Sequence, residues 1–183
     1  MSDSELTIEI VEESSISAAL DAELRGFLLC CFGAGATAFA QSRHWHDSAP
    51  AYSVTARREG TLAAHAGIIV RDVRAGGRPV RVYGIQNMGV RPEARGTGAG
   101  LLVLEAAARE AARRGIPFGM LFCVPALERY YRRDGWETRH VLVRMDYNGQ
   151  TDIPIPGKNV CMIKRLTAEA FPDGGIHLQG ADW

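Results

Sequence analysis

The stretch Val90-Arg-Pro-Glu-Ala-Arg95-Gly-Thr-Gly98-Ala-Gly100 decides the fold. Pro92 ends a strand that the apolar pattern predicts over residues 80–90, and a glycine-rich turn then enters a helix predicted over residues 98–114. Glycines let a backbone approach an anion closely, and the free amides and dipole at a helix start favour negative charge. The stretch therefore predicts a loop that binds a pyrophosphate.

The glycine spacing separates this loop from other phosphate-binding loops. A dinucleotide fingerprint needs Gly-x-Gly-x-x-Gly, and a P-loop ends in Gly-Lys-Ser or Gly-Lys-Thr. Neither pattern fits. The stretch instead resembles the acyl-CoA loop of the GNAT superfamily, Arg/Gln-x-x-Gly-x-Gly/Ala. The resemblance implies that the cosubstrate acetyl-CoA is bound by the following loop residues: Arg95, Gly96, Thr97, Gly98, Ala99 and Gly100.

A second segment supports the same resemblance. Residues 126–136, Ala-Leu-Glu-Arg-Tyr-Tyr-Arg-Arg-Asp-Gly-Trp, are similar to the superfamily's Ala-x-x-Leu-Tyr-x-x-x-Gly-Phe. The match implies that Tyr131 is a catalytic general acid for the leaving thiolate, while Tyr130, about 100° round the helix, is the expected core aromatic. It also implies that Met88, Gly89 and Val90 lie on the strand whose amide polarises the thioester carbonyl.

The remaining pattern predicts one α+β domain over residues 1–183, with a GNAT-type mixed, mostly antiparallel sheet flanked by helices. Ser14 and Ser15 are the predicted N-caps of a first helix with Leu24, Phe27 and Leu28 on its apolar face. Further strands are predicted at residues 6–11, 52–57, 62–73, 118–124, 141–147 and 159–166, with a short one within 176–183. A last helix is predicted over residues 125–134.

The composition excludes several classes of protein. Lys+Arg and Asp+Glu both number 21, so no basic excess points to nucleic acid. No apolar run approaches the ~20 residues of a membrane span, and the first residues lack signal-peptide character. The four cysteines lack metal-ligand spacing. We therefore expect a cytoplasmic protein with no nucleic-acid, membrane or metal partner. The oligomeric state stays open, with a homodimer as one option.

Residues 60–183 are also similar to the aminoglycoside 2'-N-acetyltransferases. Ala63-Ala-His65-Ala-Gly67 matches their Ile-Ala-His-Ala-Ala strand, and Gly180-Ala-Asp182-Trp183 is close to their Gly-Asp-x-Trp end. In that family the final Trp carboxylate and nearby acids hold the drug. The resemblance therefore implies a catalytic role for Trp183 and a substrate-binding role for Asp182.

The chain departs from that family at the acceptor side. The family has Glu where this chain has Gln86 and Gly where it has Asn87, and its acidic loop corresponds here to residues 33–36 without an acid. A polycationic drug would meet few counter-charges, so we expect an amino sugar with one primary amine, or a zwitterion. Kasugamycin fits this description, and it would imply a role in antibiotic resistance. The expected substrate-binding residues are Trp45, Gln86, Asn87, Phe122, Asp182 and Trp183.

The general base and the acceptor stay open. No acid lies on the strand over residues 80–90, which leaves His65, Asp182 and the terminal carboxylate as alternatives. The irregular segment His44-Trp45-His46-Asp47 is either a binding surface or a loop packed down by Trp45. The other possible acceptors are a protein N-terminus, a polyamine or a lipid-linked sugar, with residues 148–158 shaping the pocket. A non-catalytic acyl-CoA-binding module is the alternative from another class.

Overall fold

The computed structural model describes residues 5–33, 36–44, 46, 48–157 and 159–183. Contacts divide the chain into two compact units. Unit 1 comprises residues 1–45, 49–68 and 86–107, and unit 2 comprises residues 46–48, 69–85 and 108–183. Strands β3 (Thr61–Ala75) and β4 (Arg78–Val90) and helix α2 (Ala99–Arg113) contribute residues to both units.

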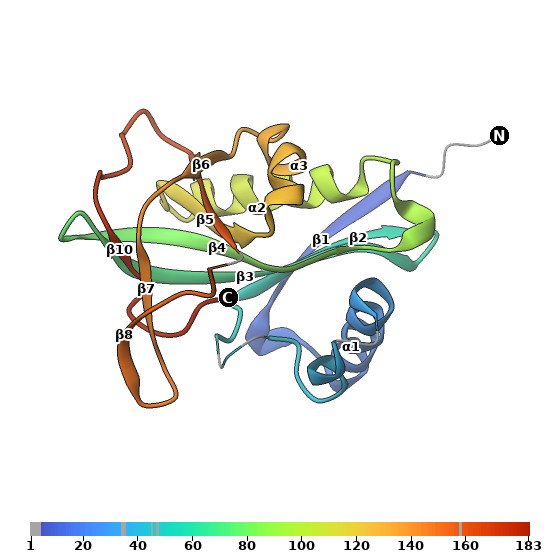
Figure 1. The fold of residues 1–183 in the computed structure, drawn as a ribbon. Helices are drawn as coiled ribbons and strands as arrows, with labels where there is room; N and C mark the ends of the chain where they lie inside the picture. The colour runs from blue at the N-terminus through green and yellow to red at the C-terminus, as the bar shows by residue number, and fades with distance from the viewer. Residues whose placement is uncertain (1–4, 34–35, 45, 47, 158) are drawn as a thin grey trace. The chain divides into compact units, whose positions relative to one another are not determined.

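Unit 1 contains three antiparallel strand segments in the order β1 (Leu6–Glu12), β2 (Tyr52–Arg58) and β3. Helix α1 (Ala18–Phe32) lies on one face of these strands and the first turns of α2 lie on the other (Figure 1). The core under α1 is formed by buried apolar side chains from the helix, the following turn and β3: Leu24, Phe27, Leu28, Ala36, Phe39 and Leu62. The apolar face predicted for the first helix is confirmed.

The start of α1 lies later than predicted. Its N-cap is Ser17, whose side chain accepts a hydrogen bond from the Leu20 amide at 3.2 Å. The predicted caps Ser14 and Ser15 instead belong to a short 3₁₀ turn, Glu13–Ser15. Serines in a row offer several cap positions, and the one that places the apolar face on the strands is occupied.

Unit 2 has the strand order β6-β9-β5-β4-β3-β10-β7-β8 (Figure 1). The remaining elements are β5 (Phe118–Cys123), α3 (Glu128–Arg132), β6 (Glu137–Arg139), β7 (Val143–Tyr147), β8 (Gln150–Pro154), β9 (Val160–Arg165) and β10 (Ile176–His177). Two described pairs are parallel, β4 with β5 and β7 with β10, and the other described pairs are antiparallel. The parallel ladder of β4 and β5 ends at Ile85 and Leu121, before either strand ends.

Three details of unit 2 differ from the sequence prediction. The helix predicted over residues 125–134 is a 3₁₀ turn, Pro125–Leu127, followed by the short α3. Strand β6 was not predicted because three residues are too few to show alternation. Strand β8 was also missed, because residues 148–158 were interpreted as a connection. Yet Asn148 and Gly149 both have positive φ, as the Asn-Gly hairpin turn requires.

The core of unit 2 depends on a close approach at Gly84 of β4. A Cβ built there would lie 2.5 Å from Ile69 Cγ1 and from two atoms of the Trp183 indole. Trp183 is 6% exposed and belongs to one apolar cluster with Phe118, Met120 and other buried residues. Only glycine lets the indole lie directly on the backbone of β4.

We therefore expect Gly84→Ala to destabilise the protein by about 1–3 kcal/mol, because the added methyl group overpacks the core. The matched control is Gly26→Ala in α1, where an added Cβ meets nothing within 4 Å. That change removes a helix-interior glycine and is expected to stabilise by up to about 1 kcal/mol. Urea unfolding of both variants measures the difference. Equal stability of the two alanine variants would contradict the close approach.

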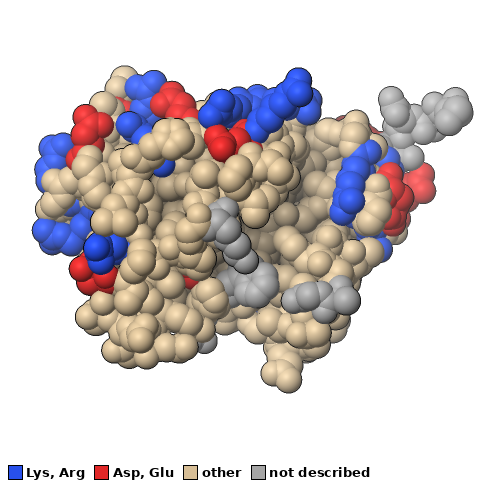
Figure 2. Space-filling view, viewed as in Figure 1, with Lys and Arg blue, Asp and Glu red and all other residues tan. Residues whose placement is uncertain are grey.

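No helix within the described part of the chain is long and apolar enough to cross a membrane. On the face drawn in Figure 2, Lys and Arg side chains lie beside Asp and Glu side chains, and wide areas carry neither.

Candidate active site

The conformation of the glycine-rich loop, residues 95–100 of unit 1, is determined by the backbone angles of two glycines. Gly96 and Gly98 have φ values of +80° and +86°, which L side chains rarely adopt, and a Cβ at either position would point into open space. Helix α2 begins directly afterwards at Ala99, so the amides of its first turn have no acceptor within the helix. The loop therefore presents free donors and the positive end of a helix dipole to an open side.

Two side chains stiffen this loop from within. Thr97 Oγ1 donates to the Ala94 carbonyl at 2.7 Å, and Arg95 Nε donates to the Val90 carbonyl at 3.3 Å. Residues 95–98 are exposed, whereas Ala99 and Gly100 are buried. A loop fixed in this way loses little conformational freedom when an anion binds.

Strand β4 carries an irregularity just before the loop. Asn87 has φ +51°, and its Nδ2 donates to the Arg43 carbonyl at 2.7 Å and to Gln86 Oε1 at 3.3 Å. Its Oδ1 is buried with no hydrogen-bond partner. Asparagine tolerates the left-handed region better than most residues. Asn87 therefore fits this backbone position.

The backbone after Asn87 approaches helix α1. A Cβ at Gly89 would lie 3.1–3.2 Å from Phe27 and Cys31, so this glycine lets the strand pack against the helix. Met88 and Val90 on either side are partly exposed. The segment predicted to hold the thioester is thus a fixed, glycine-containing strand end.

His65 is a buried hydrogen-bonding residue of unit 1. It is 1% exposed, with Nε2 3.2 Å from Ser53 Oγ and Nδ1 3.4 Å from the Asn87 carbonyl. Burial, opposed in part by the Asn87 carbonyl, lowers the pKa of His65 to about 4. His65 is therefore neutral at pH 7 and contacts Asn87 rather than solvent.

Tyr131 lies in unit 2 at the end of α3. It is 7% exposed, with ring centroids 5.2 Å from Tyr130 and 6.4 Å from Trp136. Burial, with smaller contributions from Cys123 and Tyr130, raises the pKa of Tyr131. The prediction that Tyr130 is the core aromatic is wrong, because Tyr131 is the more buried of the two. The rigid α3 and its Trp136 contact hold the Tyr131 ring in place.

Three predicted acceptor-side residues also lie in unit 2. The ring centroid of Phe122 is 5.2 Å from that of Trp183, and the guanidinium of Arg71 lies 5.3 Å from the Trp183 ring. The indole Nε1 of Trp183 is buried with no hydrogen-bond partner. Asp182 is 7% exposed and pairs with His46. Trp45, also predicted to bind substrate, lies outside the described residues.

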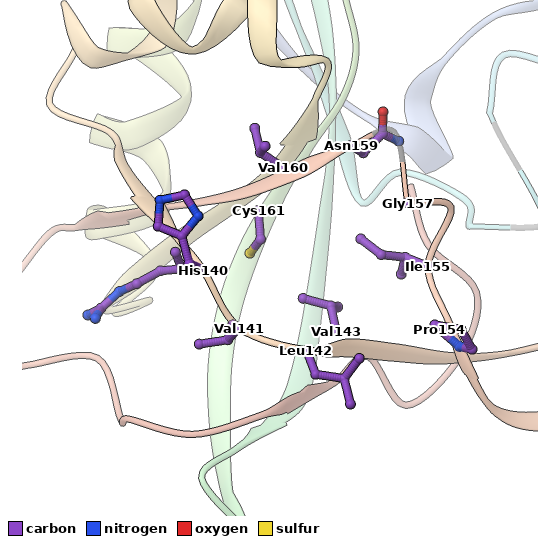
Figure 3. A pocket seen from close by; sticks show the side chains of 11 residues that line it. His140, Val141, Leu142, Val143, Pro154, Ile155, Gly157, Asn159, Val160 and Cys161 are labelled. Carbon is purple, nitrogen blue, oxygen red and sulfur yellow. The ribbon is translucent and has the colours of Figure 1, made fainter.

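An open pocket of about 340 Å³ lies elsewhere in unit 2 (Figure 3). Its lining is mostly apolar and comes from the segments around β7 and between β8 and β9, including Val141, Leu142, Ile155 and Val160. Pro154, Ile155 and Gly157 of this lining belong to the connection over residues 148–158, whose role in shaping an acceptor pocket stays a prediction. None of the predicted site residues that the structure describes lines this pocket.

Within the described residues, no group of three or more His, Cys, Asp or Glu side chains is arranged to hold a metal ion.

Comparison with known structures defines the class. YhbS of Escherichia coli, a GNAT family N-acetyltransferase crystallised with CoA, superposes with a TM-score of 0.68 at 17% identity, covering 98% of this chain and 93% of that one. A GNAT family acetyltransferase of Brucella melitensis in complex with acetyl-CoA gives 0.56 at 18% identity, covering 93% and 94%. The fold is that of the GNAT acyltransferases, as predicted.

The family model described as Nodulation protein A (NodA) matches residues 3–158 of the chain. The chain therefore belongs to the NodA family. Nodulation protein A of Azorhizobium caulinodans is 32% identical over 101 residues. The match covers 53% of this chain and 45% of that protein, so the chain spans less than half the length of this relative.

The low pKa of His65 predicts a pH dependence of stability. Between pH 6.5 and about 4 the unfolded state binds a proton that the folded state does not, so stability falls as the pH falls through this window. Wild type is expected to lose about 2 kcal/mol more than His65→Gln between pH 7.5 and pH 5. Urea unfolding followed by circular dichroism at both pH values measures this. Parallel losses in the two proteins would show that His65 is not held neutral.

Proposed function

We propose that the protein is an N-acyltransferase that moves the acyl group of an acyl-CoA, acetyl-CoA in the first instance, to a primary amine. The observation that carries the proposal is the loop of residues 95–100, with two left-handed glycines and the start of α2 open to solvent. A pyrophosphate fits such a site because amides and dipole both favour its charge. Membership of the NodA family supports transfer to an amine nitrogen.

The cosubstrate is supported by the two structural relatives that hold CoA and acetyl-CoA. In the proposed reaction the loop residues bind the pyrophosphate, and a backbone amide among Met88, Gly89 and Val90 polarises the thioester carbonyl. These roles need no ionisable side chain at the carbonyl. They require only that the strand end stays fixed, as its packing at Gly89 provides.

Tyr131 is the proposed donor to the leaving sulfur. Its raised pKa keeps the phenol protonated at neutral pH, so it can donate a hydrogen bond as the C–S bond breaks. The same raised pKa makes complete proton transfer less favourable. We therefore assign Tyr131 mainly to stabilising the thiolate.

The acceptor is proposed to be an amino sugar. The aminoglycoside and kasugamycin acceptors, with a role in resistance, stay predictions from the sequence, as do the cytoplasmic location and the homodimer. The proposed acceptor-side residues are Gln86, Asn87, Phe122, Asp182 and Trp183, together with Trp45. The buried Oδ1 of Asn87 and Nε1 of Trp183, both without described partners, support them because each can bind a polar group.

The loop assignment is tested at Gly98. Gly98→Asp and Gly98→Asn impose similar strain and bulk, since both replace a residue at φ +86°, but they differ in charge. We expect acetyl-CoA to bind the Asp variant at least about tenfold more weakly than the Asn variant, because the carboxylate repels the pyrophosphate. Isothermal titration calorimetry gives both affinities. Equal affinities would remove the loop from the cofactor site.

The activity is tested by thiol release from acetyl-CoA with glucosamine, kasugamycin, kanamycin, gentamicin and spermidine. We expect turnover with at least one amine. Tyr131→Phe should then lower kcat by roughly 10²-fold or more without changing acetyl-CoA affinity, since only the hydroxyl is lost. Tyr130→Phe is the matched control and should be mild. Acetyl-CoA binding without turnover of any amine would favour the non-catalytic acyl-CoA-binding module. A large loss of kcat in Tyr130→Phe would assign the donation to the leaving sulfur to Tyr130 instead.

A further inference from the structure

The segment before Trp183 is held by polar contacts inside unit 2. Arg71 Nη1 donates to the Ala181 carbonyl at 2.6 Å, and Ser48 Oγ donates to the Asp182 carbonyl at 2.9 Å. Arg71 also donates to Ser48 Oγ at 3.1 Å. These bonds fix the backbone of Asp182, so its carboxylate has a defined position.

That carboxylate meets His46. Asp182 Oδ1 is hydrogen-bonded to His46 Nδ1. The imidazole also lies against Tyr147, with ring centroids 4.5 Å apart. The His46 side chain is 35% exposed, whereas that of Asp182 is 11% exposed. A buried carboxylate thus orients a histidine that solvent can reach.

The backbone of His46 is also unusual, with φ +41°. A left-handed non-glycine residue is costly, and such residues concentrate at functional sites. Here this conformation accompanies the contact of the imidazole with Asp182.

The contact determines the state of the ring. An ionised carboxylate accepts hydrogen bonds only, so Nδ1 must carry the proton of the neutral imidazole, and Nε2 then carries the lone pair. A histidine whose Nδ1–H is bound by a buried Asp is the arrangement in which imidazole acts as a general base.

We propose that His46 is the general base of the amine transfer and that Asp182 is its positioning residue. The inference rests on the proposed function and supplies the base that the sequence did not identify. Nε2 takes a proton from the acceptor ammonium, and the neutral amine then forms a C–N bond with the thioester carbon. The C–S bond breaks, the amide nitrogen loses its second proton to solvent, and the thiolate leaves with the hydrogen bond of the proposed donor.

The other described histidines near a partner do not offer the same arrangement. His65 is buried and neutral. In His177 the Nδ1 accepts the Gln179 amide at 3.1 Å, so a neutral His177 ring carries its proton on Nε2, which lies 3.3 Å from Asp146. The described contacts of His46 within unit 2 include Asp182 and Tyr147, and Arg71 lies beyond Asp182.

The geometry is tested first, without any substrate. In protein labelled with ¹⁵N-histidine, the ring signals of His46 are assigned as those lost in His46→Gln. We expect the neutral ring to be the Nδ1–H tautomer in wild type and to gain Nε2–H character in Asp182→Asn. An Nε2–H ring in wild type would overturn the proposal, whether or not any amine is acetylated.

The catalytic role is tested with the panel amine that wild type uses best. His46→Ala and Asp182→Asn should each lower kcat by roughly 10²-fold. Acetyl-CoA affinity should stay unchanged. Added imidazole should restore turnover by at least severalfold in His46→Ala and should not do so in Asp182→Asn, where the native ring still fills the site.

The matched control is His177→Gln, which removes another Asp-paired histidine of unit 2 and should leave kcat unchanged. A purely structural role for His46 would lower the stability of His46→Ala without any rescue by imidazole, and that result would overturn the proposal. If no amine is acetylated while the tautomer is as expected, the proposed function fails, and with it the role of base, while the paired geometry stands.

Discussion

Close packing against the backbone of β4 is the constraint on which the rest of the structure depends. In unit 2 the indole of Trp183 lies on Gly84, and in unit 1 helix α1 lies on Gly89. A Cβ at Gly84 would lie 2.5 Å from its neighbours and force a shift, whereas a Cβ at Gly89 would make tight contacts of 3.1–3.2 Å. Between the two glycines the chain passes through the left-handed Asn87, and beyond them Pro92 leads into the loop. Strand β4 thus contributes a close-packing glycine to each unit, and in unit 1 it carries the proposed carbonyl-binding amides.

The parts of the fold that are determined by residues adjacent in the sequence could be predicted. The glycine loop, the strands β3, β4 and β5, and helix α2 each have a local pattern that the structure confirms. The Asn148-Gly149 turn also had a local signal, but the surrounding prolines and glycines favoured an irregular connection. Strand β6 had no signal, since its residues Glu137-Thr-Arg139 are all polar and pair through their backbone.

The candidate site could be predicted only in part. The loop was found because its function lies in consecutive residues. The pairing of His46 with Asp182 joins positions 136 residues apart, and no local pattern reports such a contact. The burial of Tyr131 was also misjudged, because two adjacent tyrosines on a helix differ by only one step round its axis. Which of them faces the core depends on Trp136, and therefore on the packing of α3.

Both described tryptophans lie in unit 2, so their fluorescence reports on that unit. Trp136 and Trp183 both belong to unit 2 and are buried, whereas the third, Trp45, lies outside the described residues. Indole emission from the two buried rings therefore follows the loosening of unit 2, while circular dichroism sees the helices and strands of both units. Coincident denaturation curves from the two signals would mean that the units melt as one cooperative block. Different midpoints of the two denaturation curves would mean that one unit unfolds while the other, which shares strand β4 with it, stays folded.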